Sequence, residues 1–162
     1  MDKNSKRVIT TSGLKEAQEK LEYLTSVRRR EVTEQIATAR GFGDLSENAE
    51  YDEALNEQSR LEGEISELQE YIRNAVIVDE NKVNIRTVNI GSKVTVYDAF
   101  EEDTVTYYIV GARESDPLKG KISNESPIGA ALMGHKKGDV VKVEAPAGMY
   151  ELEIKKIERM GK

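Results

Sequence analysis

Two carboxylates three residues apart, Asp44 and Glu47, are the residues of this sequence whose types and spacing could do chemistry. They stand in the stretch GDLSENAEY, just after Gly41 and Gly43. Mg²⁺ is typically held by one or two carboxylates with waters and substrate phosphates, so such a pair could contribute to a magnesium site. An Asp-x-x-Glu pattern after glycines is also typical of a helix start, where side-chain oxygens accept from unpaired backbone N–H groups. The spacing permits a metal-binding pair without requiring one, and by itself it favours the helix cap.

Two runs with helical periodicity flank this stretch and would have to position it. Thr10 is suited to cap the first run, with Ile9 and Leu14 as a hydrophobic staple. Apolar residues then recur in steps of three and four, with a slip at the arginine cluster, at Leu14, Ala17, Leu21, Leu24, Val32, Ile36 and Ala39. The second run keeps its register, at Tyr51, Ala54, Gln58, Leu61, Ile65, Leu68, Ile72 and Ala75. The two runs predict an antiparallel helical hairpin, with arms of roughly 40 Å at about 1.5 Å per residue.

The register of the second run can be continued backwards by one heptad. Positions 51 and 54 then become 44 and 47, which would place both carboxylates on the inward-facing stripe beyond the last apolar layer. Two carboxylates side by side would repel each other if they were buried as a pair. We therefore expect them at the far end of the hairpin.

The second half of the sequence has a different pattern. Short runs alternate apolar and polar residues, at Val94 and Val96, at Val105, Tyr107 and Ile109, at Val141 and Val143, and at Tyr150, Leu152 and Ile154. One helix interrupts them, with Ser126 as its cap, Pro127 in its first turn and Gly134 as its stop. We expect an α+β fold in two domains, a coiled-coil hairpin over residues 1–79 and a small antiparallel-sheet domain with one helix over residues 80–162.

Composition limits the possible functions. The net charge of −6 lies entirely in residues 1–79, which argues against simple nucleic-acid binding by that half. The absence of cysteine excludes disulfides and thiolate metal sites. The single histidine, His135, follows Gly134 and precedes two lysines, so we expect a surface turn residue rather than a catalytic base. With no apolar segment of signal-peptide or transmembrane type, we expect a soluble, cytoplasmic protein.

A family resemblance extends over almost the whole chain. ATARGFGDLSENAEYDEA, from Ala37 to Ala54, resembles the tip motif of the bacterial GreA/GreB transcript cleavage factors. TTSGLKEAQEKLEYLTSVRR and EQSRLEGEISELQEYIRNAVIVD are similar to the two arms of that family's coiled coil. The C-terminal stretch that contains SPIGAALMGHKKGD is similar to its globular domain, in the form found in the GreA branch. The resemblance implies a coiled-coil hairpin followed by an FKBP-like domain.

The resemblance also implies a function and a set of site residues. Family members bind bacterial RNA polymerase, insert the coiled coil into its secondary channel and stimulate cleavage of the 3′ end of backtracked nascent RNA. The tip acids map onto Asp44 and Glu47, which would act in trans on a Mg²⁺ shared with the polymerase, so the protein would bind no cofactor alone and would be no enzyme by itself. Residues that would support the tip and the RNA are Arg40, Asn48, Tyr51 and Arg60. Residues that would dock on the polymerase are Asn124, Ser126, Pro127 and Ile128, although Ser126 and Pro127 could equally do no more than begin a helix. We expect a monomer that does not bind membranes.

Two other hypotheses remain open. The chain has Leu55 and Asn56, and also Ser46, at positions where the family usually has basic residues, which is compatible with a channel-binding paralogue that modulates or inhibits the polymerase and stimulates cleavage weakly. The FKBP-like fold suggests a peptidyl-prolyl isomerase as the third hypothesis. That activity needs an aromatic-lined apolar pocket, and the chain has no tryptophan and only Phe42 and Phe100 as phenylalanines.

Overall fold

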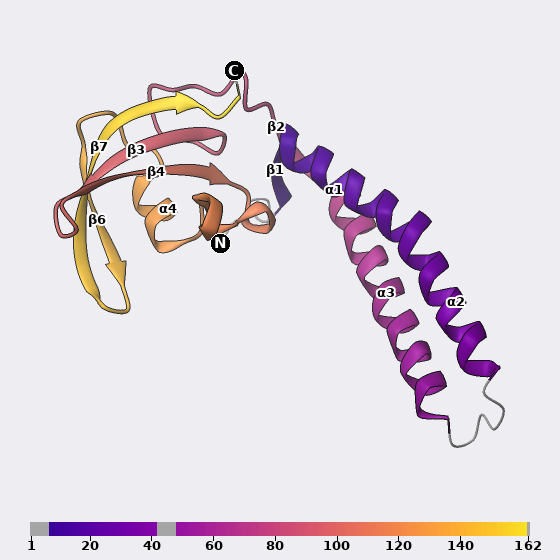
Figure 1. Ribbon diagram of the computed structural model, residues 1–162. Coiled ribbons are helices and arrows are strands. Elements are labelled where there is room, and N and C mark those ends of the chain that lie inside the picture. The colour runs from indigo at the N-terminus through magenta and orange to yellow at the C-terminus, as the bar shows by residue number, and fades with distance from the viewer. Residues whose placement is uncertain (1–6, 42–47, 162) are drawn as a thin grey trace. The chain divides into compact units, whose positions relative to one another are not determined.

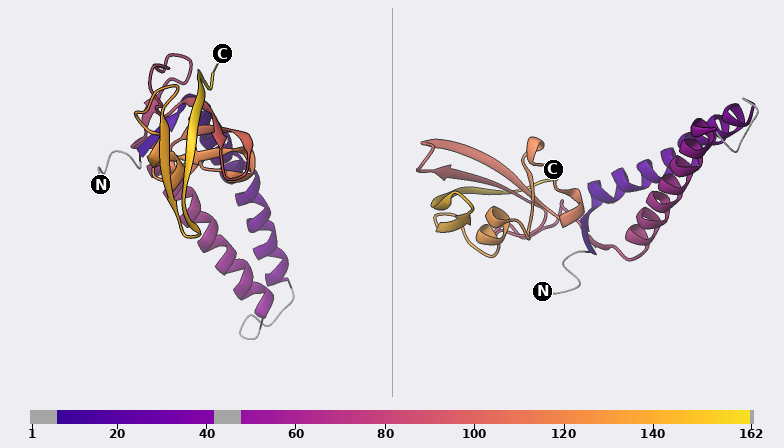
Figure 2. Two further views of the ribbon diagram at one scale, coloured as in Figure 1. Left: turned by 90° about the vertical axis from the view of Figure 1, so that its left-hand side faces the viewer. Right: turned by 90° about the horizontal axis from the view of Figure 1, so that it is seen from below.

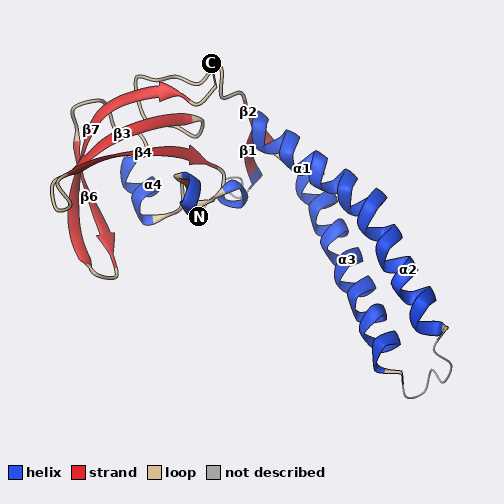
Figure 3. Ribbon diagram, viewed as in Figure 1, coloured by secondary structure: helices blue, strands red, loops and turns tan. Residues whose placement is uncertain are grey.

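The structure is a computed structural model that describes residues 7–41 and 48–161 of the chain. Asp44 and Glu47, together with Phe42, lie outside the described residues. The chain divides into two compact units, one made of Met1–Leu14 with Ala75–Lys162 and the other of Lys15–Asn74. Figures 1 and 3 show the second unit as paired helices and the first as a sheet with short helices.

The helical unit is the predicted antiparallel hairpin. Its first arm consists of α1 (Thr11–Tyr23), whose first turn belongs to the sheet unit, a π-helical segment (Leu24–Arg28) and α2 (Arg29–Arg40). Its second arm is α3 (Ala49–Arg73), which lies alongside α2 in every view (Figures 1 and 2). The buried residues are those of the periodic pattern, Leu24, Val32, Ile36, Ala54, Leu61, Ile65 and Leu68. The hairpin is therefore held together by a single apolar seam.

The slip in the first periodic run has a structural cause. A π-helical turn contains about one residue more than an α-helical turn, so it absorbs one extra residue in the pattern. The π-helical segment Leu24–Arg28 lies where the apolar spacing changes, between Leu24 and Val32. The hydroxyl of Thr25 donates to the Leu21 carbonyl oxygen at 2.9 Å. The widened turn returns Val32 to the seam, where it is buried.

Ion pairs link the two arms along the outside of the seam. Lys20 contacts Glu64 at 3.2 Å, Arg28 contacts Glu57 at 3.2 Å, and Arg29 contacts Glu62 at 2.8 Å. Exposed pairs of this kind add little to stability individually, because solvent screens them. In all three pairs the base belongs to the first arm and the acid to α3, so the charges of the two arms are complementary.

The sheet unit contains a five-stranded sheet in the order β5-β4-β3-β7-β6 and a two-stranded sheet of β1 and β2. The strands are β1 (Val8–Thr10), β2 (Val76–Val78), β3 (Ser92–Asp98), β4 (Asp103–Val110), β5 (Lys121–Ser123), β6 (Val140–Ala145) and β7 (Gly148–Arg159). Short helices η3 (Ala112–Glu114), η4 (Pro117–Lys119) and α4 (Pro127–Leu132) complete the unit. The sheet curls, and α4 lies inside the curve (Figure 1).

The five-stranded sheet is mixed rather than fully antiparallel as expected. β4 and β5 are parallel, with Ile109 opposite Ile122. Parallel neighbours need a crossover connection, and the segment with η3 and η4 provides it. The core on the inner face is formed by Val88, Val94, Val96, Ile109, Leu132, Val141, Val143, Leu152, Ile154 and Ile157.

The division into units differs from the boundary expected after residue 79. β1 precedes the first arm and β2 follows the second, and the two strands pair in parallel, with Ile9 opposite Ile77. This pairing joins residues far apart in the sequence, so both ends of the hairpin segment belong to the sheet unit. The expected boundary placed the short apolar run VIV at residues 76–78 in the coiled coil, whereas the structure makes it strand β2.

Candidate functional site

Among the described residues near the far end of the hairpin, Asn48 makes hydrogen bonds to both arms. Its backbone is extended (φ −91°, ψ 94°), and its Oδ1 accepts a hydrogen bond from the Tyr51 N–H at 3.0 Å. Its Nδ2 donates to the carbonyl oxygen of Ala39 at 2.6 Å. Helix ends leave such N–H and C=O groups without intrahelical partners. Asn48 therefore satisfies one group at the start of α3 and one near the end of α2.

This geometry shows which residue begins α3. The N-cap of α3 is Asn48 and its first residue is Ala49, so the Asp44–Glu47 pattern does not begin this helix. Asp44 and Glu47 themselves lie outside the described residues.

Two further predicted tip residues lie beside Asn48. The guanidinium carbon of Arg40 lies 5.7 Å from the centre of the Tyr51 ring, within the range of a cation–π contact. The ring of Tyr51 packs against the apolar seam of the hairpin. The structure thus brings Arg40, Asn48 and Tyr51 together where the two arms meet.

The fourth predicted support residue, Arg60, lies elsewhere. It is nine residues beyond Tyr51 on α3, or about 13 Å along a helix that rises about 1.5 Å per residue. Its guanidinium contacts the Glu57 carboxylate at 2.7 Å. The hydrogen bond from Arg60 lowers the pKa of Glu57, and Arg28 adds to that effect.

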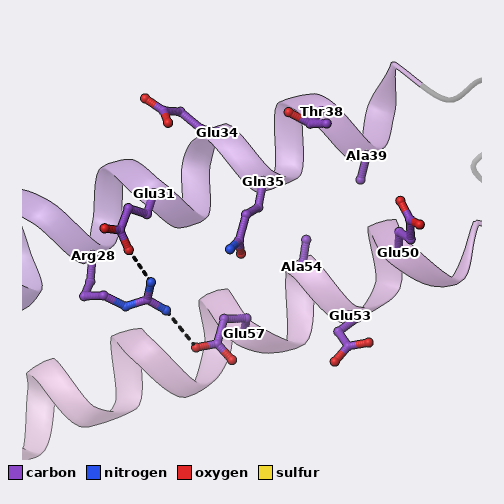
Figure 4. A pocket seen from close by; sticks show the side chains of 10 residues that line it. All are labelled: Arg28, Glu31, Glu34, Gln35, Thr38, Ala39, Glu50, Glu53, Ala54 and Glu57. Atoms are coloured by element: carbon purple, nitrogen blue, oxygen red, sulfur yellow. Dashed lines mark hydrogen bonds and ion pairs between the residues drawn. The ribbon is translucent and has the colours of Figure 1, made fainter.

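An open groove of about 760 Å³ runs between α2 and α3 next to the tip (Figure 4). Its lining contains one base among several acids and consists of Arg28, Glu31, Glu34, Gln35, Thr38, Ala39, Glu50, Glu53, Ala54 and Glu57. The Arg28 guanidinium donates hydrogen bonds to the carboxylates of Glu31 and Glu57. The hydrogen bond to Glu31 is the main cause of the raised pKa of Arg28. Within residues 7–41 and 48–161, no three His, Asp or Glu side chains are placed to hold a metal ion. The described lining of the groove is mainly acidic.

The predicted docking residues surround the start of α4. The Ser126 hydroxyl accepts from the Gly129 N–H at 3.1 Å and donates to the Ser123 carbonyl oxygen at 2.7 Å, so the predicted cap is confirmed. Pro127 occupies the first turn and is exposed, whereas Ile128 packs against the sheet core. The side-chain oxygen of Asn124 is buried without a hydrogen-bond partner.

Two carboxylates that the sequence did not single out hold the start of α1. Glu80 accepts from the Thr11 hydroxyl at 3.1 Å, and from the Ser12 N–H and hydroxyl, both at 3.0 Å. Glu114 accepts from the Thr10 N–H at 3.0 Å, from the Thr10 hydroxyl and from the Gly111 N–H at 3.0 Å.

The predicted cap by Thr10 is present within this arrangement. Its hydroxyl oxygen accepts from the Gly13 N–H at 3.1 Å. A Cβ on Gly13 would lie 1.9 Å from Glu114 Oε1, so only glycine leaves room for this carboxylate. Glu80 and Glu114 are 68 and 104 residues from their partners, and no local pattern could have identified them.

His135 behaves as the sequence suggested. Its Nδ1 lies 3.2 Å from Asp139 Oδ2 in an exposed turn. The pKa of Asp139 is lowered, first by the hydrogen bond from the Lys136 N–H and then by His135.

In the described part of the chain, no helix is both long enough and apolar enough to cross a membrane.

The structure thus defines a class of protein with two units, an antiparallel helical hairpin and a curled mixed sheet with short helices. Residues 82–159 match the protein family described as "Transcription elongation factor, GreA/GreB, C-term". Residues 7–77 match the family described as "Transcription elongation factor, N-terminal". The chain belongs to the GreA/GreB family of transcription elongation factors.

Individual relatives cover nearly all of the chain. "Transcription elongation factor GreA" of Thermoanaerobacter pseudethanolicus is 52% identical over 152 residues, which are 94% of this chain and 97% of that protein. The protein of the same name from Clostridium perfringens is 49% identical over 154 residues, which are 95% of this chain and 98% of that protein. The crystal structure of GreA factor homolog 1 of Thermus thermophilus is 27% identical, with 93% of this chain and 97% of that chain covered and a TM-score of 0.42.

Proposed function

We propose that this protein binds bacterial RNA polymerase, inserts its hairpin into the secondary channel and stimulates cleavage of backtracked nascent RNA at its 3′ end. The observation that supports this proposal best is the dual role of Asn48, which caps α3 and bonds the Ala39 carbonyl. Since Asn48 supplies the helix cap, Asp44 and Glu47 are not needed for that purpose. The proposal assigns these two carboxylates, which precede Asn48 in the sequence, to chemistry instead.

The chemistry would depend on a cation that the polymerase shares. A bound Mg²⁺ lowers the pKa of its water and offsets charge on a phosphate. Two carboxylates with waters and a phosphate suit Mg²⁺ as ligands, whereas two carboxylates alone make a weak site. Asp44 and Glu47 would therefore act in trans and hold the cation only within the polymerase complex.

The residues around the junction would support the RNA. Arg40 is held over the Tyr51 ring, and cation–π contact with the ring face leaves guanidinium N–H groups free to donate to a phosphate. Arg60 is paired with Glu57, so its contribution would require exchange of that partner. Asn48 would fix the residue at which α3 begins.

Docking on the polymerase would use the surface around α4. Pro127 is exposed there, and the buried Asn124 oxygen has no partner within the described chain. The N–H of Gly129 is already capped by Ser126, so a partner would meet side chains rather than a free helix end. Asn124, Ser126, Pro127 and Ile128 are the proposed docking residues.

One observation favours the paralogue as the alternative. Leu55 packs against the apolar seam, and the neighbouring groove is acidic, so this side of the hairpin offers little attraction to RNA phosphates. Such a protein would occupy the channel while stimulating cleavage weakly. The isomerase hypothesis gains no support from Phe100, because this side chain is 82% exposed and lines only an open hollow at one end of the sheet.

The test is cleavage of a stalled, backtracked elongation complex with Asp44→Asn and Glu47→Gln. Each amide keeps the size of the side chain but is a much poorer Mg²⁺ ligand, so cleavage should fall by orders of magnitude. Competition for the channel and thermal stability should hardly change. Glu50→Gln, which removes an acid from the first turn of α3, is the matched control and should cleave normally.

Normal cleavage by both single variants in complexes that they still bind would refute the assignment. Weak cleavage by the unaltered protein, together with full competition for the channel, would favour the paralogue. The protein without polymerase should leave free RNA intact in the presence of Mg²⁺.

A further inference from the structure

One end of the five-stranded sheet carries a hollow that the proposed function does not use. Residues of the β3–β4 and β6–β7 turns and of the adjoining strand ends line an open hollow of about 320 Å³. The lining residues are Asp98, Phe100, Glu101, Ala145, Ala147, Gly148, Met149 and Tyr150. None of the four proposed docking residues contributes to it.

Hydrogen bonds within the β3–β4 turn hold the backbone on the aromatic side of the hollow. Oδ1 of Asp98 accepts from the Phe100 N–H at 2.9 Å and from the Glu101 N–H at 3.3 Å. These bonds fix the backbone that carries Phe100, which is nevertheless 82% exposed. A large aromatic side chain held in water on a fixed turn is typical of an interaction surface.

The opposite side of the hollow is apolar and adaptable. Met149 is 63% exposed and follows Gly148 at the start of β7, while Ala145 and Ala147 leave room beside it. The unbranched methionine side chain can adjust to the shape of a partner. An aliphatic side chain would lie well between Met149 and Phe100.

The charge of this region limits the occupant. The segment DAFEED at residues 98–103 carries four acids and no base, and Asp98 and Glu101 line the hollow itself. Burial raises the pKa of Tyr150, and the nearby charge of Asp98 adds to that effect. The phenol that lines the hollow therefore stays neutral. A nucleic acid would be repelled by this surface. A second copy of the chain would bring the same acids face to face.

We propose that this hollow is a docking surface for a segment of a partner protein that carries an arginine or lysine next to an aliphatic residue. The cation lies over the face of Phe100 and pairs with Glu101, and the aliphatic side chain packs on Met149. This surface is additional to the proposed polymerase contacts around α4. Its existence does not depend on transcript cleavage.

The probe is the peptide acetyl-Leu-Arg-Leu-Arg-amide, added to the full-length protein and followed by amide chemical shifts in NMR. Shifts should concentrate at residues 98–102 and 147–150 and should weaken as salt is added. Phe100→Ala should weaken binding about tenfold, as expected for an aromatic residue at the centre of an interface. Glu101→Gln should weaken binding and reduce its salt dependence. Leu118→Ala is the matched control, since Leu118 is 99% exposed and lies in η4, outside the hollow.

Several results would overturn the proposal. Equal binding by Phe100→Ala and Leu118→Ala would remove the hollow from the interaction. An equal response to acetyl-Leu-Glu-Leu-Glu-amide would show that charge plays no part. Self-association of the protein in sedimentation, abolished by Phe100→Ala, would assign the surface to a second copy instead.

Discussion

Replacement of Glu80 by alanine tests how the start of α1 is held. The Glu80 side chain is only 8% exposed, and its two oxygens accept three hydrogen bonds from Thr11 and Ser12. Alanine removes both acceptor oxygens, and with them all three hydrogen bonds, and also a negative charge near the positive end of the helix dipole. The Ser12 N–H is one of the helix-start donors that have no intrahelical partner.

The expected loss can be estimated from these contacts. A hydrogen bond to a charged group contributes about 1.5–3 kcal/mol, and the two hydroxyl donors can turn towards water, so their share is small. The dipole term adds about 0.5 kcal/mol. Together these give a loss of about 3 kcal/mol for Glu80→Ala. Glu80→Gln keeps a carbonyl oxygen for the Ser12 N–H and should lose about 1 kcal/mol.

The assay is urea unfolding followed by circular dichroism, with hydrogen exchange at the Ser12 and Gly13 amides as a local measure. Because the chain has two compact units, the exchange data show which one has lost stability. Glu19→Ala, at an exposed position on the same helix, is the matched control and should change stability by less than about 0.5 kcal/mol. If Glu80→Ala is no less stable than Glu19→Ala, the carboxylate does not hold the helix start.

Three further predictions concern the hairpin. Gly63→Ala should stabilise it by about 1 kcal/mol and raise the thermal midpoint, because Gly63 lies inside α3 and an added Cβ meets nothing within 4 Å. Asn48→Ala should cost about 2 kcal/mol in thermal unfolding, since it removes the cap and the bond to Ala39, whereas Asn48→Asp keeps the cap and should recover about half. The pKa of Glu57 is lowered mainly by Arg60, so its stabilising contribution should be complete above the ordinary carboxyl pKa of about 4.3 and be lost as the pH falls through the lowered value. Acid titration of helicity checks this, and Glu57→Gln should flatten the response.

The elements that the sequence predicted well are those whose side chains repeat regularly. Leu61, Ile65 and Leu68 are all buried, as their steps of three and four required. Val94 and Val96 are buried on one face of β3, as their alternation required. In both cases one local pattern determines which face is apolar, and the rest of the chain has only to cover that face.

Features that depend on distant partners could not be predicted in this way. The parallel pairing of β1 with β2 joins Val8 to Val76, and the bonds of Glu80 and Glu114 to the start of α1 join residues of comparable separation. A three-residue strand has too little periodicity to reveal its partner. The slip in the first run was visible, but only the structure assigns it to a π-helical turn at Leu24–Arg28.

The tip shows why one local pattern prevailed over another. Both Asp44 and Asn48 can accept a hydrogen bond at a helix start, and the Asp-x-x-Glu pattern favours Asp44. An ionised aspartate can only accept, whereas the amide of Asn48 also donates, and that donor reaches the carbonyl of Ala39 on the opposite arm. A cap at Asn48 therefore satisfies both helices with one side chain, which a carboxylate cannot do. Described residues thus account for the start of α3, and the proposed role of Asp44 and Glu47 in metal-assisted cleavage is tested by the Asp44→Asn and Glu47→Gln variants.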